Sequence, residues 1–268
     1  MIDLGTDTAA PSLAPTTLSV DEILFLVDRL KLDMLPVVLD IAPRFETIDE
    51  RDDEYRALAA ALEERGLLDA TGRVAPDLAD ALAVVARPSW EIALRWSVGG
   101  AVSRLCLSHG EHSAVVTMRA GESLVVRDAG PDPLGAVQAA VGTVPPVSFN
   151  SVNAPTQQLS EALDNTADAA SLTAALTAIG VGYDDAATVG KAMAGCTTFA
   201  EIVGLVYGEG NYDPVGGPVT VFDTDLGRIV GTSSVSGHGV AWSSLAPGTP
   251  ARFRQALDSL VDRLTDAE

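Results

Sequence analysis

The stretch WEIALRWSVGGAVSRLCLSHGEHSAVVTMRAGESLVVRD, residues 90–128, predicts four consecutive antiparallel strands. Apolar side chains at every second position of 90–98 alternate with a more polar set that begins at Glu91, and this period of two is typical of a strand with one buried and one partly solvated face. Gly99 and Gly100 form a two-residue hairpin turn, since glycine adopts positive φ at little steric cost. The predicted strands are 90–98, 101–109, 113–119 and 122–128.

The same order of elements returns about 110 residues later, with predicted strands at 197–207, 219–223, 228–235 and 240–244. Each set of strands is preceded by about three helical segments. Each is followed by a turn in which Asp132 or Thr249 is the expected N-cap of a helix with proline at its first position. The pattern therefore predicts an α+β fold with a quasi-twofold repeat. Whether the two sheets join edge to edge is left open, although joining would hide two exposed edges.

Predicted helices occur in both halves of the chain. Ser19 and Glu22 form a capping box at the start of the first helix. The other helical segments are 50–65, 76–86, 156–165, 169–179, 184–193 and 251–264. The predicted organisation is a disordered tail at 1–17, an N-terminal half at 18–142, a proline-rich linker at 143–155 and a C-terminal half at 156–268.

The net charge of −20 narrows the possible partners. Such a charge repels phosphate backbones and anionic lipids, so we expect neither nucleic acid nor a membrane surface as a partner. We expect no membrane insertion, because no apolar run approaches the roughly 20 residues needed to span a bilayer. The chain starts without a secretory leader pattern, which favours a cytoplasmic location. Cys106 and Cys196 are expected to be reduced, buried thiols.

The most enzyme-like string is the apolar strand 219–222 followed by Asp223, Thr224 and Asp225. Haloacid dehalogenase-type phosphotransferases present two carboxylates around Mg²⁺ in this way. Against this reading, Asp225 begins a short turn before the next strand, and only 43 residues follow it. A metal-dependent phosphohydrolase remains the alternative function.

Other catalytic or cofactor patterns are weak. His109, His112 and His238 lack the spacing of a zinc site, and the glycine-rich segment 208–217 precedes a strand and carries no lysine. We therefore expect no catalytic residue, metal or cofactor, and a binding protein is favoured over an enzyme. A small-ligand module with its site between the halves is a third possibility.

Four short segments resemble the EspG family of secretion-associated proteins from mycobacterial and related actinobacterial type VII (ESX) systems. They are Leu18–Leu24 (LSVDEIL), Arg87–Trp90 (RPSW), Gly231–Ser234 (GTSS) and Trp242–Gly248 (WSSLAPG), and the resemblance covers residues 18–264. It implies a central antiparallel β-sheet flanked by N- and C-terminal helical bundles with a quasi-twofold. It also implies an ATP-independent cytosolic chaperone that binds a PE–PPE heterodimer at the apolar tip of the PPE protein.

The resemblance also implies where that client binds. The family's client surface is associated with the sheet, one inter-strand loop and the C-terminal bundle, which corresponds here to 108–113 and 209–234. A weak homodimer through an exposed sheet edge is a further expectation. The candidate partner-binding residues are Ser108, His109, Glu111, His112, Glu209, Tyr212, Asp213, Asp225 and Ser233.

Overall fold

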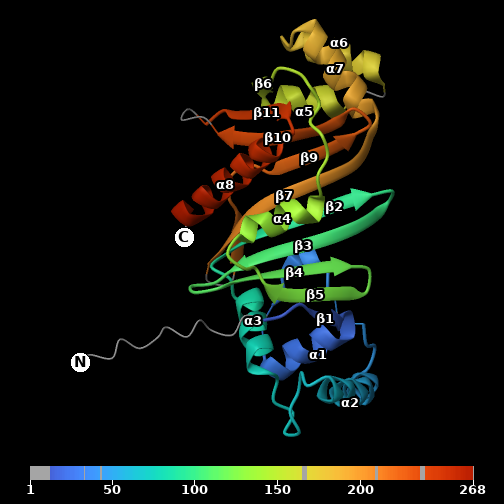
Figure 1. Cartoon of the computed structure of the whole chain (residues 1–268), viewed down its shortest axis with the longest axis vertical. Coiled ribbons are helices and arrows are strands. Elements are labelled where there is room, and N and C mark those ends of the chain that lie inside the picture. The colour runs from blue at the N-terminus through green and yellow to red at the C-terminus, as the bar shows by residue number, and fades with distance from the viewer. Residues whose placement is uncertain are drawn as a thin grey trace, which may run out of the picture.

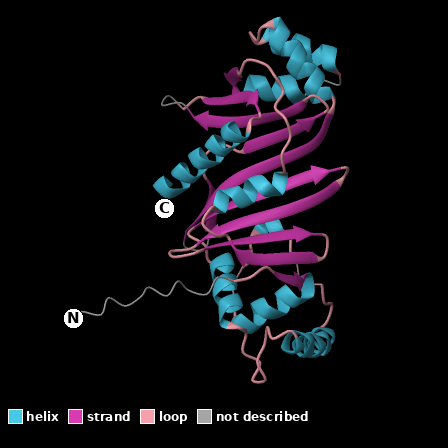
Figure 2. Ribbon diagram, in the orientation of Figure 1, coloured by secondary structure: helices cyan, strands magenta, loops and turns pink. Residues whose placement is uncertain are grey.

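A computed structural model describes residues 13–32, 34–42, 44–164, 168–208, 211–235 and 239–267. In this part of the chain eleven strands form one sheet in the order β1-β5-β4-β3-β2-β7-β9-β10-β11-β6, with β8 pairing to β7. Figures 1 and 2 show the sheet as the long central layer of the molecule. Its strands are β1 (Thr16–Ser19), β2 (Trp90–Val98), β3 (Ala101–His109), β4 (Ala114–Ala120), β5 (Ser123–Asp128), β6 (Val152–Pro155), β7 (Cys196–Gly208), β8 (Asn211–Pro214), β9 (Val219–Thr224), β10 (Gly227–Val235) and β11 (Ala241–Pro247).

The two predicted sheets are joined through β2 and β7. These strands pair antiparallel over nine residues, from Trp90 opposite Val206 to Val98 opposite Thr198. The middle of this ladder is the pair Leu94–Ile202, and the strand order reads the same outwards on both sides of it. Each side has a four-stranded meander and one short outer strand. The quasi-twofold α+β fold is therefore confirmed, and the open question about the two sheets is answered by their fusion.

Both outer strands lie where the sequence predicted none. β1 includes Thr16 and Thr17 of the predicted tail, and β6 falls within the predicted linker 143–155. β1 pairs with β5, and β6 pairs with β11. Strands of four residues with mixed polar composition carry almost no periodic signal, and a neighbouring strand decides whether they form. The division of the chain into two halves remains a prediction.

Two helices, α4 (Pro133–Val141) and α8 (Pro250–Ala267), cover one face of the sheet side by side (Figure 1). They bury one face of the central strands, where Leu94 and Ile202 pack with Phe253 and Leu257 of α8. α4 begins at the predicted N-cap Asp132, whose side chain accepts a hydrogen bond from the backbone N–H of Gly135.

The other helices form bundles at the two ends of the sheet (Figure 1). In the N-terminal bundle, Leu26 and Leu82 pack with Leu124 and Val126 of β5. In the C-terminal bundle, Leu159 packs with Ile229 and Leu245 of β10 and β11. The N-terminal elements are α1 (Val20–Leu30), the 3-10 turn η1 (Val37–Leu39), α2 (Ile48–Glu64) and α3 (Pro76–Ala86), and the C-terminal ones are α5 (Thr156–Asp164), α6 (Ala169–Ala178) and α7 (Tyr183–Ala194).

Two sequence expectations are wrong in detail. Glu91 was placed on the partly solvated face of the first strand but is fully buried, because both faces of β2 are covered at its N-terminal end. Cys196 was expected to be buried but is exposed at the start of β7, whereas Cys106 is buried as predicted; both are free thiols. Among the described residues, no helix is both long enough and apolar enough to cross a membrane.

Candidate partner-binding groove

An apolar groove of about 440 Å³ lies between the C-terminal bundle and the sheet. One wall is α5 with the end of α7, and the other is the set of strands β7, β9, β10 and β11. We call it the apolar groove and define it by its lining residues. These are Thr156, Leu159, Ser160, Leu163, Asp164, Met193, Phe199, Pro218, Thr220, Phe222, Gly231, Thr232, Ser233, Ser243, Ser244 and Leu245.

Two phenylalanines form the aromatic part of the apolar groove. Phe199 of β7 pairs in register with Phe222 of β9, and their ring centroids are 5.3 Å apart. Phe222 packs into the core of the C-terminal bundle, whereas the Phe199 residue is 39% exposed. An exposed aromatic ring next to an apolar wall is a suitable anchor for an apolar partner.

Gly231 of β10 keeps the groove open. A Cβ atom at this position would lie 2.2 Å from Oγ1 of Thr220 and 3.4 Å from Cδ2 of Leu245. Any side chain here would therefore displace the neighbouring strand residue or fill the space above it. The glycine leaves a recess in the surface formed by β9, β10 and β11.

Hydroxyl groups line one side of the apolar groove. The Oγ atoms of Ser233 and Ser243 are 2.9 Å apart, and Ser243 Oγ donates to Oγ1 of Thr156 over 3.0 Å. This chain links β10, β11 and the first residue of α5. An apolar floor with polar groups at the rim is the usual composition of a protein–protein contact site.

The carboxylates of the phosphohydrolase alternative do not converge. Asp223 is buried and accepts two hydrogen bonds from Arg228, Nε to Oδ1 over 2.6 Å and Nη2 to Oδ2 over 2.8 Å. Asp225 is exposed in the turn between β9 and β10. Among the described residues, no group of three or more His, Cys, Asp or Glu side chains could hold a metal ion. The structure gives the phosphohydrolase alternative no support.

Comparison with known proteins places the chain in a family. The model of the EspG family matches residues 19–259, which is most of the chain. The chain belongs to the EspG family.

Two relatives are similar along most of their length. This EspG-family chain is 26% identical over 261 residues to ESX-1 secretion-associated protein EspG1 of Mycobacterium tuberculosis, covering 95% of this chain and 89% of the relative. It is 27% identical over 252 residues to ESX-1 secretion-associated protein EspG1 of Mycobacterium marinum, covering 92% of this chain and 87% of the relative.

A solved structure shares the fold. It is that of the M. tuberculosis type VII secretion system chaperone EspG5 in complex with a PE25–PPE41 dimer. The TM-score is 0.77 at 18% identity, with 93% of this chain and 96% of that chain covered. The expected fold of an EspG protein, a central antiparallel sheet with helical bundles at both ends, is thereby confirmed.

The predicted partner-binding residues of this EspG protein fall in separate places. Ser233 lies in the apolar groove. Glu111 and His112 are exposed in the turn between β3 and β4. His109 stacks on Trp90 with ring centroids 4.4 Å apart, which directs its ring onto the core side of the sheet.

Ser108 belongs to a buried polar cluster and is not exposed. Its Oγ lies 3.2 Å from Sγ of Cys106, and that thiol donates to Oε2 of Glu91 over 3.3 Å. Burial raises the pKa of both Glu91 and Cys106. It also raises the pKa of the neighbouring Tyr207. This cluster is enclosed in the sheet below the β3–β4 turn and presents no group to a partner.

Tyr212 and Asp213 are exposed on β8, where Tyr212 pairs with Tyr207 at a centroid distance of 6.1 Å. Asp225 lies in the turn before β10, and Ser233 is six residues beyond the start of that strand, about 20 Å at the rise of an extended strand. Glu209 lies outside the described residues. The predicted positions therefore do not form one continuous site.

The sequence reasoning missed the apolar side chains of the groove. Phe199 was placed in a strand but not in a site, although it shares a strand face with the charged Glu201. Phe222 lies in the segment 219–225, whose aspartates suggest phosphoryl transfer. For Leu159 and Met193 the sequence predicts only positions in the helices 156–165 and 184–193. The local signal available was a phenylalanine two residues before the charged Glu201 on one face of this strand.

Proposed function

We propose that this EspG-family protein is a cytoplasmic, ATP-independent chaperone that binds a PE–PPE heterodimer and keeps it soluble for type VII secretion. Family membership and the EspG5 fold support the proposal. EspG5 itself is solved in complex with a PE25–PPE41 dimer. The relatives named EspG1 are described as secretion-associated proteins.

The single observation that carries the proposal is the apolar groove beside Phe199. A helical client with an apolar tip would aggregate through that tip, so covering it is a physical need. The groove presents Leu163 and Phe199, beside the buried Leu159, at a surface that the rest of the fold leaves uncovered. Burial of a few such anchors supplies affinity without nucleotide hydrolysis.

We propose that the client's apolar tip occupies this groove. The hydroxyls of Thr156, Ser233 and Ser243 would then bind backbone groups at the end of the client helix, where carbonyl and N–H groups lack partners within the helix. Tyr212, Asp213, Glu111 and His112, which lie elsewhere on the sheet, are candidates for secondary contacts.

Co-expression with the cognate PE–PPE pair tests the proposal. We expect one peak containing all three proteins in size-exclusion chromatography. Phe199→Ser should weaken the complex roughly tenfold or more, because a well-buried aromatic anchor contributes about 1.5–3 kcal/mol. Tyr183→Ser is the matched control, since Tyr183 is 69% exposed on α7 outside the groove. Separate elution of the wild-type protein and its cognate pair would reject the proposal.

We also propose that the protein catalyses no phosphoryl transfer. Asp223 is held by Arg228 and Asp225 by the hairpin turn, which argues for structural roles. Assays with Mg²⁺ and a generic phosphomonoester should give the same background turnover for wild type and Asp225→Asn. Turnover above background that is lost in Asp225→Asn would contradict this.

A further inference from the structure

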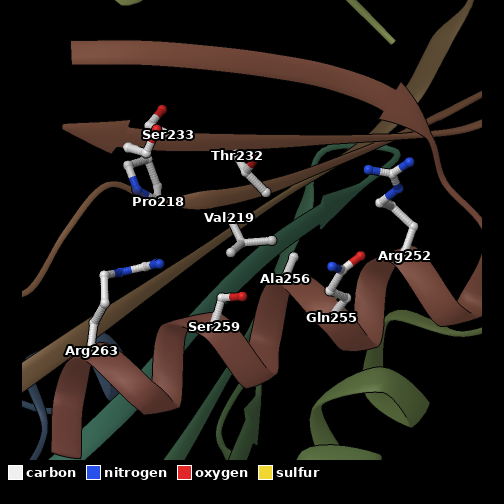
Figure 3. Close-up of a pocket in the computed structure, with 10 residues that line it drawn as sticks. Pro218, Val219, Thr232, Ser233, Arg252, Gln255, Ala256, Ser259 and Arg263 are labelled. Atoms are coloured by element: carbon white, nitrogen blue, oxygen red, sulfur yellow. The ribbon is translucent and has the colours of Figure 1, made fainter. Parts of the chain in front are cut away.

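A second groove lies on the opposite face of the sheet, where α8 meets β9 and β10 (Figure 3). Its volume is about 240 Å³. We call it the arginine groove. Its lining residues include two arginines and no acidic residue, in a chain with 37 Asp and Glu against 17 Lys and Arg. They are Pro218, Val219, Thr232, Ser233, Ser234, Arg252, Gln255, Ala256, Ser259 and Arg263.

The helical wall of the arginine groove is a polar stripe along α8. Arg252, Gln255, Ser259 and Arg263 follow one another at intervals of three or four residues, so they lie on one face of the helix. The two arginines stand at opposite ends of the groove (Figure 3). Eleven residues at the helical rise separate their backbones by about 16 Å.

Neither guanidinium has an acidic partner among the described residues. By contrast, Arg254 on the same helix pairs with Asp132 at 2.8 Å and with Asp258 at 2.9 Å. The buried Nε of Arg263 has no hydrogen-bond acceptor in the described part of the chain. This Nε is covered by Gly216, so a ligand oxygen at this end of the groove would accept from the terminal nitrogens of the guanidinium, which make no ion pair within the described residues.

Arg252 stands in an unusual place on its helix. It lies in the first turn of α8, which contains no acidic residue. The positive end of the helix dipole favours an anion there and disfavours a cation. The helix end and the Arg252 guanidinium therefore act together on any carboxylate that approaches this end of the groove.

The opposite wall consists of hydroxyl-bearing strand residues. Thr232 of β10 faces the helix across the groove (Figure 3), its neighbours Ser233 and Ser234 complete this wall, and Pro218 and Val219 lie beside them at the start of β9. Such residues can bind the backbone of an extended segment whatever its side chains are. The two arginines would then make the groove specific for segments with acidic side chains.

We propose that the arginine groove binds an extended acidic segment of a protein partner. Two carboxylates of the segment contact Arg252 and Arg263. A separation of about 16 Å corresponds to roughly five residues of extended chain, so the segment carries acidic residues about five positions apart. The overall negative charge of the protein repels such a segment at long range, but screening at physiological salt limits this repulsion to about 8 Å. Contacts with the two arginines therefore determine whether the segment binds.

The position of the groove indicates which partner carries the segment. The arginine groove and the apolar groove share Pro218, Thr232 and Ser233, so the two are continuous around this end of β10. A client seated in one groove reaches the other directly. That the segment belongs to the PE–PPE client rests on the proposed function; the affinity of the groove for acidic peptide does not.

Synthetic peptides test the inference on the intact protein. The probe is a Gly/Ser peptide of eleven residues whose only charged side chains are glutamates at positions 3 and 8, labelled for fluorescence anisotropy. We expect it to bind the wild-type protein about tenfold more tightly than the same peptide with glutamines, because hydrogen bonds between ions are roughly twice as strong as neutral ones. In ¹⁵N NMR spectra, binding should shift the Arg252 and Arg263 side-chain signals and the amides of 232–234.

The variant Arg252→Ala/Arg263→Ala should weaken binding of the glutamate peptide about tenfold. The control Arg51→Ala/Arg56→Ala removes the same charge from α2 and should leave binding within about twofold. Arg252→Gln alone, at an exposed position, should weaken binding about threefold with an unchanged melting temperature.

Equal binding of the two peptides, undetectable binding of the glutamate peptide to wild type, or equal effects of the two double variants would each overturn the inference. Failure of the PE–PPE pair to bind would instead remove the client as the source of the segment.

Discussion

The pair Asp223–Arg228 shows that an aspartate at the end of an apolar strand can be structural and not catalytic. Asp223 follows an apolar strand, as a catalytic aspartate does, but its carboxylate is buried against the Arg228 guanidinium. Arg228 also donates to the carbonyls of Val141 and Gly142 over 3.0 and 2.8 Å. These carbonyls end α4, where a cation is favoured. The pair therefore fastens the covering helix to the sheet.

Loss of this pair should strongly destabilise the protein. Asp223→Asn leaves the Arg228 charge buried with neutral acceptors only, so we expect a loss of about 3–5 kcal/mol in the free energy of unfolding. Urea denaturation followed by circular dichroism measures it. Asp225→Asn, two residues away and exposed, is the control and should change stability by less than about 0.5 kcal/mol. Equal stability of the two variants would contradict the structural role of Asp223.

A second prediction at the residue scale concerns Glu91 and the pH dependence of the stability of the protein. Burial raises its pKa above the ordinary 4.5, with the Tyr207 hydroxyl and the Cys106 thiol opposing part of the rise. The folded state thus binds the proton more tightly than the unfolded chain. Protonated Glu91 therefore stabilises the folded state. This contribution is fully present below pH 4.5 and is lost as pH rises through the folded-state pKa of Glu91.

The variant Glu91→Gln keeps the shape of the protonated acid and does not titrate. Unfolding free energies of both proteins, measured by urea denaturation from pH 4.5 to 8, should show the wild type losing stability relative to the variant as pH rises. A constant difference over this range would contradict a raised pKa at Glu91.

At the scale of elements, α1 depends on its N-terminal cap. Ser19 Oγ accepts from the N–H of Glu22 over 3.0 Å, and Glu22 Oε2 accepts from the N–H of Ser19 over 2.7 Å. Glu22 also pairs with Arg65 at the end of α2, at 2.6 Å. The capping box predicted from sequence is confirmed, and the structure adds that it links two helices and ends the edge strand β1.

Ser19→Ala should therefore lower the free energy of unfolding by about 1 kcal/mol, which for a chain of this size is roughly 2–4 °C in melting temperature. Ser259→Ala on the exposed surface of α8 is the control, with an expected change below about 0.5 kcal/mol. Differential scanning calorimetry compares them. An unchanged melting temperature for Ser19→Ala would show that the cap carries no stability.

At the scale of the whole molecule, the ladder between β2 and β7 joins the two sides of the sheet. A fragment of residues 13–142 would expose the whole β2 edge. We expect such a fragment to dimerise through β2, with a true twofold in place of the quasi-twofold, or to aggregate. Light scattering after size exclusion gives its mass. Ala93→Lys in the fragment should shift it towards monomer, because charge at an edge opposes strand pairing. A monomeric unsubstituted fragment would contradict this.

The sequence by itself determined the two meanders, the helices around them and the repeat, because alternating and helical periods, glycine turns and caps are local signals. It indicated the family through four short segments between Leu18 and Gly248. Only the tertiary structure decided that β2 and β7 join the sheets, that β1 and β6 close the edges and that Glu91 is buried. It also brought Leu159, Phe199 and Phe222 into one groove. These features depend on contacts between residues far apart in the chain, which no local pattern records.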